Sequence, residues 1–137
     1  MKKDSDSPEL TTAQTSGIES FLETVSGAIF QILPQPHSED FEFYSITSHP
    51  LSRLSIHLSE SDPFTAHRRS QDIRGDSAFD YLVLVPMEGS ADIEQEKSTF
   101  PVHPGSMAII PGGLPYQLSF PEIGKRLLLR IPLQVFH

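Results

Sequence analysis

The sequence predicts a mostly β protein, an antiparallel sandwich or barrel with one helix near its N-terminus. Between Asp80 and Phe120, short apolar runs alternate with turns that contain glycine or proline, at a spacing of about eight to twelve residues. The 137 residues include 12 prolines and 8 glycines, which suits a fold with many turns. Residues 53–59 alternate as a strand does, with Leu54 and Ile56 on one side and Ser55 and His57 on the other.

The composition is that of one acidic domain. A chain of 137 residues with formal net charge −8 is long enough for one core, and its charge repels nucleic-acid phosphates. The absence of cysteine excludes disulfides and thiolate metal sites. No apolar stretch reaches the roughly 18 residues of a membrane span, and no apolar segment follows the N-terminal lysines as in a signal peptide. We therefore expect a cytoplasmic protein that neither enters a membrane nor binds DNA through these residues.

The first element expected after the N-terminus is a helix. Residues 1–14 are polar and charged, which favours a flexible tail. Over about residues 16–33 the apolar residues then recur with a helical period. Ser16 and Glu19 fit a capping box, and Pro34 would end the helix because proline lacks the required N–H group. The periodic positions are Ile18, Phe21, Leu22, Val25, Ile29, Ile32 and Leu33. We expect this helix to cover one face of the sheet; the alternative is a helix exposed for a partner.

Several strands follow. Residues 41–47, 53–59 and 64–70 are predicted strands, and residues 71–78 a polar loop. In the apolar run that leads to Gly89, Pro86 indicates an edge position or a bulge, because proline cannot donate to the hydrogen-bond ladder. Residues 126–131 form the last predicted strand. Pro132 suits the first turn of a following helix, which the sequence ends almost at once, and we interpret the chain as a fragment of a longer protein.

The turn-rich block resembles the cupin barrel. Pro104-Gly105, five residues, and then the run from Pro111 to Tyr116 are similar to the second cupin motif. Cupin enzymes usually close that motif with a metal-binding histidine, and the position here is Tyr116. The first motif places a glutamate seven residues before a glycine, and counting back from Gly89 gives Leu82, with no paired histidines near residues 76–78. The resemblance implies a cupin-like barrel without its metal site.

The order of these segments also resembles the N-terminal effector-binding domain of AraC-type transcriptional regulators. The matching segments are HRRS (67–70), FDYLVLVPMEG (79–89), HPGSMAIIPGGLPYQLSF (103–120) and RLLLRIPLQVF (126–136), and Ser106 departs from an acidic residue usual in the family. The resemblance implies a cupin-like regulatory domain over residues 15–137 that receives a small effector or a protein signal and can pair with a second copy. In such regulators a C-terminal helix-turn-helix domain, absent from this sequence, binds the DNA.

Two side chains are the main candidates for contact with an effector. Tyr116 takes the inward position of the cupin histidine, so its hydroxyl could meet a ligand; the alternative is a core tyrosine bonded to the backbone. Arg69 could hold a carboxylate with its guanidinium; the alternative is an ion pair with Asp72 or Asp80. The expected apolar wall of the site consists of Leu82, Leu84 and Leu118.

Two rival functions stay open at this point. A free-standing, metal-free binding or interaction domain would have the same barrel without a transcriptional role. A metal-dependent cupin enzyme would need two or three converging ligands, which the six histidines do not supply in a recognisable pattern. We therefore expect no cofactor, no metal and no catalytic residues.

Overall fold

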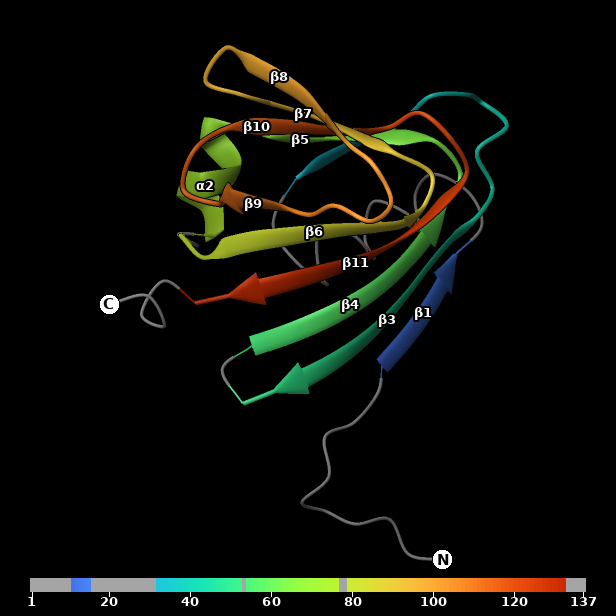
Figure 1. Ribbon diagram of the computed structural model, residues 1–137, viewed down its shortest axis with the longest axis horizontal. Coiled ribbons are helices and arrows are strands. Elements are labelled where there is room, and N and C mark those ends of the chain that lie inside the picture. Colours follow the sequence, from blue (N-terminus) through green and yellow to red (C-terminus); the bar gives the residue numbers. More distant parts are fainter. Residues whose placement is uncertain (1–10, 16–31, 53, 77–78, 133–137) are drawn as a thin grey trace, which may run out of the picture.

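The computed structural model describes residues 11–15, 32–52, 54–76 and 79–132. Within them, two antiparallel sheets face each other as a sandwich, and one short helix closes one end (Figure 1). The six-stranded sheet has the order β1 (Thr11–Thr15), β3 (Tyr44–Leu51), β4 (Leu54–Ser61), β11 (Gly124–Ile131), β6 (Tyr81–Glu88), β9 (Ala108–Pro111). The five-stranded sheet has the order β2 (Leu33–Pro36), β5 (Phe64–Arg68), β10 (Tyr116–Phe120), β7 (Ala91–Gln95), β8 (Ser98–Val102).

The core lies between the two sheets, because alternate residues of each strand point inward. Phe64 of β5 is at the centre of an aromatic group. Its ring meets Phe41 and Tyr44 edge-on, with centroids 6.4 and 6.1 Å away, and Phe120 at 5.1 Å. The remaining core side chains are mostly aliphatic and come from both sheets. The sandwich interior is therefore the place where a buried site can form.

The N-terminal predictions need correction. Residues 11–14 do not belong to a tail, because they form β1, in which Thr11 pairs with Ser48 of β3. The predicted helix over residues 16–33 falls mostly on residues 16–31, which lie outside the described residues. Its last predicted residue, Leu33, begins strand β2 instead, so the helix does not extend that far.

The described helix, α2 (Ser70–Asp76), occupies the segment predicted as a polar loop. Its first turn is stabilised by Asp72, whose carboxylate accepts the backbone N–H of Arg69 at 2.9 Å, one half of a capping box. Ile73 is a buried residue of this helix. The strand before the helix is shorter than predicted, because β5 ends at Arg68 rather than at residue 70.

The bulge expected at Pro86 is present. In the β6–β11 pair the register shifts, since Arg126 lies opposite Pro86 whereas Lys125 lies opposite Glu88. Met87 is the extra residue. Strand β9 pairs only with residues 81–84 of β6, so the pairing does not require the N–H group that Pro86 lacks. Proline is tolerated here because β9 does not reach it and the register of the pairing with β11 is interrupted beside it.

Two turns depend on a left-handed backbone. Gly89, with φ 81°, turns the chain from β6 to β7, and Gly105, with φ 95°, turns it between β8 and β9. Both values fall where glycine has no steric penalty. The hairpin between β7 and β8 instead uses Glu96 and Lys97 at φ 51° and 68°, a primed turn that matches the twist of its strands.

Candidate functional site

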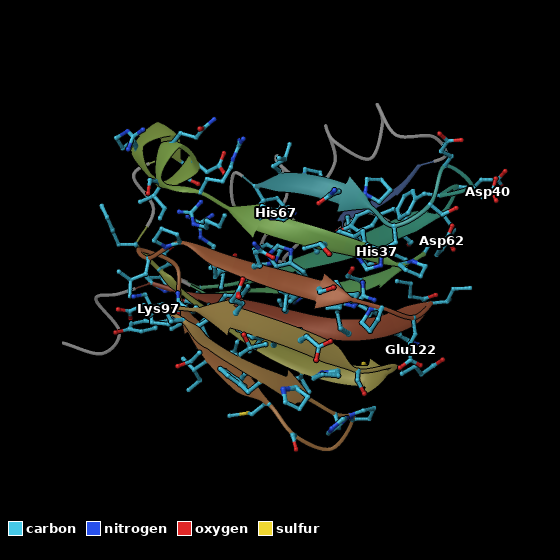
Figure 2. The ribbon with its side chains drawn as sticks, turned by 90° about the horizontal axis from the view of Figure 1, so that it is seen from above. His37, Asp40, Asp62, His67, Lys97 and Glu122 are labelled. Atoms are coloured by element: carbon cyan, nitrogen blue, oxygen red, sulfur yellow. The ribbon has the colours of Figure 1, made fainter. Side chains whose placement is uncertain are left out.

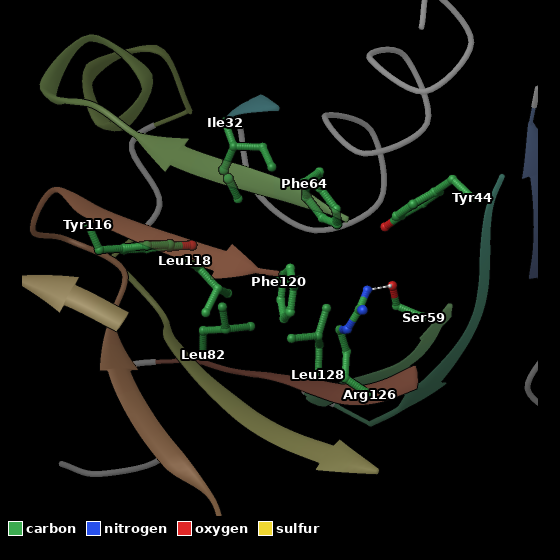
Figure 3. Close-up of a pocket in the computed structure, with 11 residues that line it drawn as sticks. Ile32, Tyr44, Ser59, Phe64, Leu82, Tyr116, Leu118, Phe120, Arg126 and Leu128 are labelled. Atoms are coloured by element: carbon green, nitrogen blue, oxygen red, sulfur yellow. Dashed lines mark hydrogen bonds between the residues drawn. The ribbon is translucent and has the colours of Figure 1, made fainter. Parts of the chain in front are cut away.

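A cavity of about 40 Å³ lies between the two sheets (Figure 3). Its walls are mostly apolar and come from both sheets. Four side chains bring polar groups to it: Tyr44, Ser59, Tyr116 and Arg126. The other lining residues are Ile32, Phe64, Ala66, Leu82, Leu118, Phe120 and Leu128. A space of this size holds a few water molecules or one small functional group.

Arg126 is the most unusual side chain in this cavity. It is 2% exposed, and its Nη1 donates hydrogen bonds to Ser61 Oγ at 2.8 Å and to Ser59 Oγ at 3.3 Å. The guanidinium also lies over the ring of Phe120, 3.9 Å from its centroid, a cation–π contact. Burial lowers the pKa of Arg126 to about 10, so the group is still a cation at neutral pH.

The local backbone makes room for this arginine. Gly124 precedes it by two residues on the same face of β11, and a Cβ at Gly124 would lie 2.6 Å from the carbonyl oxygen of Glu88 and 3.0 Å from Nη2 of Arg126. The bulge of β6 is directly opposite, and bulges often redirect a neighbouring side chain. In the register of the sheet, Arg126 faces Ser59 of β4.

Sequence reasoning missed Arg126 because it ranked the faces of β4 by polarity alone. Leu54, Ile56 and Leu58 form the apolar face, yet they are only half-buried, whereas His57 and Ser59 on the other face are buried. The available signal was the combination of small polar residues on β4 with an arginine at inward parity with Leu128 on β11. Neither strand shows this by itself.

Two tyrosine hydroxyls point toward the cavity from opposite ends (Figure 3). Tyr44 is hydrogen-bonded to Ser59, at the end occupied by Arg126. Tyr116 enters from the other end, and its hydroxyl makes no hydrogen bond to a described residue. Burial raises the pKa of both phenols, so both stay protonated and can donate. The structure thus has the predicted inward orientation of Tyr116, and no backbone group of the described residues bonds its hydroxyl.

A second hollow of about 500 Å³ opens at the end of the sandwich near α2. Arg69, Tyr116 and Lys97 all line it, so the two predicted candidates do lie close together. Figure 2 shows Lys97 at this end of the five-stranded sheet, with Asp40, Asp62 and Glu122 at the opposite end. The remaining lining residues are His67, Arg68, Ser70, Glu94, Gln95, Glu96, Pro115 and Gln117. This hollow is open and is lined mainly by polar and charged residues, unlike the interior cavity.

Arg69 does not enter the sandwich. Its guanidinium bonds both oxygens of Asp72, Nε to Oδ2 at 2.8 Å and Nη2 to Oδ1 at 3.0 Å, and its side chain is 40% exposed. The ion pair with Asp72 that was the alternative interpretation is therefore present. Its neighbour Arg68 is the inward arginine, because it shares parity with Phe64 and lies opposite Tyr116 in the β5–β10 register.

Of the three predicted wall leucines, two line the interior cavity. Leu82 of β6 and Leu118 of β10 face each other across it. Leu84 is fully buried in the core but is not among the lining residues. Its parity was predicted correctly, and its position along the strand places it beyond the cavity.

The residues at the two cupin ligand positions are poor ligands for a metal. Leu82 has no donor atom, and Tyr116 keeps its proton because burial raises its pKa. Among the described residues, no three histidine or carboxylate side chains converge on one point. The described chain also has no helix that is long and apolar enough to cross a membrane.

We expect the purified protein to hold no stoichiometric transition metal, because both ligand positions lack a suitable donor. Elemental analysis after incubation with zinc or manganese and desalting would check this. Retention of about one metal per chain would contradict the expectation and favour a cupin enzyme.

Comparisons with known proteins connect this fold to a family. The family model of the AraC-binding-like domain matches residues 36–137 of this chain. The transcriptional activator NphR of a Rhodococcus species is 28% identical over 86 residues, which are 63% of this chain and 26% of NphR. This chain thus spans about a quarter of that relative.

Solved structures confirm the predicted fold class. The AraC-like transcriptional activator CuxR superposes with a TM-score of 0.75 at 17% identity, covering 91% of this chain and 48% of CuxR. The EutQ protein of Clostridium difficile gives a TM-score of 0.54 at 15% identity, covering 69% of this chain and 71% of EutQ. At these identities the structures show the shared fold alone. Because the family model extends over most of the sequence, the chain belongs to the AraC-binding-like domain family.

Proposed function

We propose that this chain is the effector-sensing domain of a transcriptional regulator and that it controls a DNA-binding domain outside these residues. The family match supports the regulatory role, and domains of this family are typically non-enzymatic. The observation that carries the proposal is the cavity between the sheets, where apolar walls surround a few buried polar groups. This combination is typical of sites that select small molecules. Such a regulator would work in the cytoplasm, where its promoters are.

The size of the cavity suggests how a signal is generated. At about 40 Å³ it admits a functional group of an effector but not a whole effector molecule. Binding therefore requires lining side chains to move apart. An effector that binds only the expanded form shifts the population toward it, and the surfaces of the two sheets change with it. A second copy of the chain or the DNA-binding domain would then detect the change.

A screen of small molecules by thermal unfolding tests the proposal. The library includes neutral compounds, acids, amines and nucleotides. We expect at least one class to stabilise the folded chain, by about 2.7 kcal/mol at a hundredfold excess over Kd. If no class stabilises it, the sensing role fails and a surface that receives a protein signal replaces it.

Two buried alanines offer a matched pair of variants that locates the bound compound. Ala66 lines the cavity, whereas Ala91 is buried in the core outside it. Ala66→Val should weaken binding by about tenfold or more, about 1.4 kcal/mol, because the added methyl groups occupy the cavity. Ala91→Val adds the same volume elsewhere and should leave the affinity unchanged. Equal effects of the two variants would place the binding site outside the cavity.

A further inference from the structure

We propose that Arg126 binds the carboxylate of the effector, whose apolar body lies along the ring of Phe120, and that the effector is a small organic acid. This inference rests on the sensing function proposed above and specifies the chemistry of the same cavity. It replaces Arg69, the candidate from sequence, by an arginine on the last strand.

The first argument is the pairing of the arginines. Arg68 pairs with Asp76, Arg69 with Asp72, and Arg130 with Asp80, each at 2.7 or 2.8 Å. Arg126 is as deeply buried as Arg68, yet no carboxylate among the described residues forms a salt bridge with it. A buried charge without a counter-ion is costly, and most proteins pair it. An effector carboxylate would supply the missing counter-ion.

The second argument is the direction of the free donors. A guanidinium has five N–H groups, and both hydrogen bonds that Arg126 donates to described residues come from Nη1. The Nε and Nη2 groups remain, and two adjacent N–H groups of this kind match the two oxygens of a carboxylate. Since Arg126 lines the cavity, a molecule that enters it and moves the lining side chains apart would meet the guanidinium.

The third argument concerns the rest of the effector. Phe120, Leu128 and Leu118 line the path away from Arg126, which suits an aromatic or aliphatic body. At the far end, the hydroxyl of Tyr116 faces the cavity and lacks a partner among the described residues (Figure 3). It would donate to an acceptor atom of the effector. The cavity therefore favours an acid with an apolar middle and a polar atom at its other end.

A purely structural role for Arg126 makes a different prediction. Its bonds to Ser59 and Ser61 and its contact with Phe120 would then be sufficient, and the charge of a ligand would not matter. Pairs of acids and their primary amides separate the two cases, because each pair has nearly the same shape and differs in charge. Suitable probes are benzoate with benzamide, phenylacetate with phenylacetamide, and octanoate with octanamide.

We expect wild-type protein to bind at least one of these acids about a hundredfold more tightly than its amide, as measured by calorimetry and thermal shift. In Arg126→Gln the acid should lose this advantage, and Arg126→Lys should retain part of it. Lys125→Gln is the matched control, because Lys125 is the neighbouring cation on β11 but is partly exposed and contacts Glu60 at 3.8 Å. That variant should keep the full preference for the acid.

One measurement needs no variant and covers the case in which Arg126→Gln does not fold. In wild-type protein labelled with ¹⁵N, the Nε–H resonance of Arg126 should shift when the acid is added and not when the amide is added. An unshifted resonance, or a preference for the acid that survives Arg126→Gln, overturns the inference. So does a screen in which only neutral compounds bind the cavity, although the sensing function then stands. If no compound of any class binds, both proposals fail.

Discussion

Replacing Arg68 by methionine is expected to lower the free energy of unfolding by about 3 kcal/mol. Its guanidinium bonds both oxygens of Asp76, at 2.8 and 3.0 Å, and its Nε donates to the carbonyl oxygen of Gly112 at 2.8 Å. The variant removes the cation that bonds both oxygens of Asp76 and the donor that bonds the carbonyl of Gly112. We take the lower end of the usual cost, because 17% of the Asp76 side chain is exposed and water can solvate part of it.

The adjacent arginine is the matched control for this prediction. Arg69 pairs with Asp72 at the surface, with 40% of the arginine side chain exposed. Arg69→Met should therefore lower the free energy of unfolding by less than about 1 kcal/mol. Denaturant unfolding of both variants, with the m-value checked against wild type, gives the comparison. Equal losses of unfolding free energy in the two variants would mean that the contacts of Arg68 with α2 and with the turn at Gly112 contribute no more than a surface ion pair.

The folded protein is expected to lose about 3 kcal/mol of stability as the pH falls from 6.5 to 4, because of His57. This histidine is buried on β4, where its Nδ1 contacts Ser48 Oγ at 2.7 Å and its Nε2 contacts Ser55 Oγ at 3.0 Å. Burial, together with the charge of Arg130, lowers the pKa of His57 to about 4. The folded state therefore resists protonation in a pH range where the unfolded state accepts it.

The direction follows from that difference. Between pH 4 and 6.5 the unfolded chain binds the proton at His57 and the folded chain does not, so each step down in pH favours unfolding. The stability is fully present above pH 6.5, and the loss levels off below about 4. Asp72 affects stability at lower pH. Its bonds to Arg69 lower the pKa of its carboxyl group, so its contribution to stability is lost only as the pH falls through that lowered pKa.

A variant isolates the contribution of His57. His57→Gln keeps a side chain that can bond Ser48 and Ser55 but cannot be protonated. The difference in unfolding free energy between wild type and this variant should change with pH between 6.5 and 4 and be constant above 7. A difference that does not depend on pH in this range would show that His57 is not held neutral by the fold.

Local sequence patterns predict much of the fold. Period-two alternation and the turns at Gly89 and Gly105 predict the antiparallel strands, and both glycines adopt the left-handed backbone that only such residues adopt readily. Pro86 predicts the bulge, because a missing N–H cannot be compensated within a regular ladder. The ion pair of Arg69 with Asp72 was one of the two interpretations of Arg69 that the sequence left open, whereas the helix start that places the two residues together was not predicted.

The sequence by itself determined most of the strands from Tyr44 onward and their turns, because these follow from backbone sterics and from alternation along each strand. The inward position of Tyr116 was predicted from the resemblance to the second cupin motif. Only the tertiary structure decided which face of β4 and β11 is internal. Alternation defines two faces of a strand but does not say which one meets the other sheet. Here the serine face of β4 turns inward, because Ser59 and Ser61 accept hydrogen bonds from Arg126 on the neighbouring strand. That contact joins residues 65 or more positions apart, so no local pattern contains it.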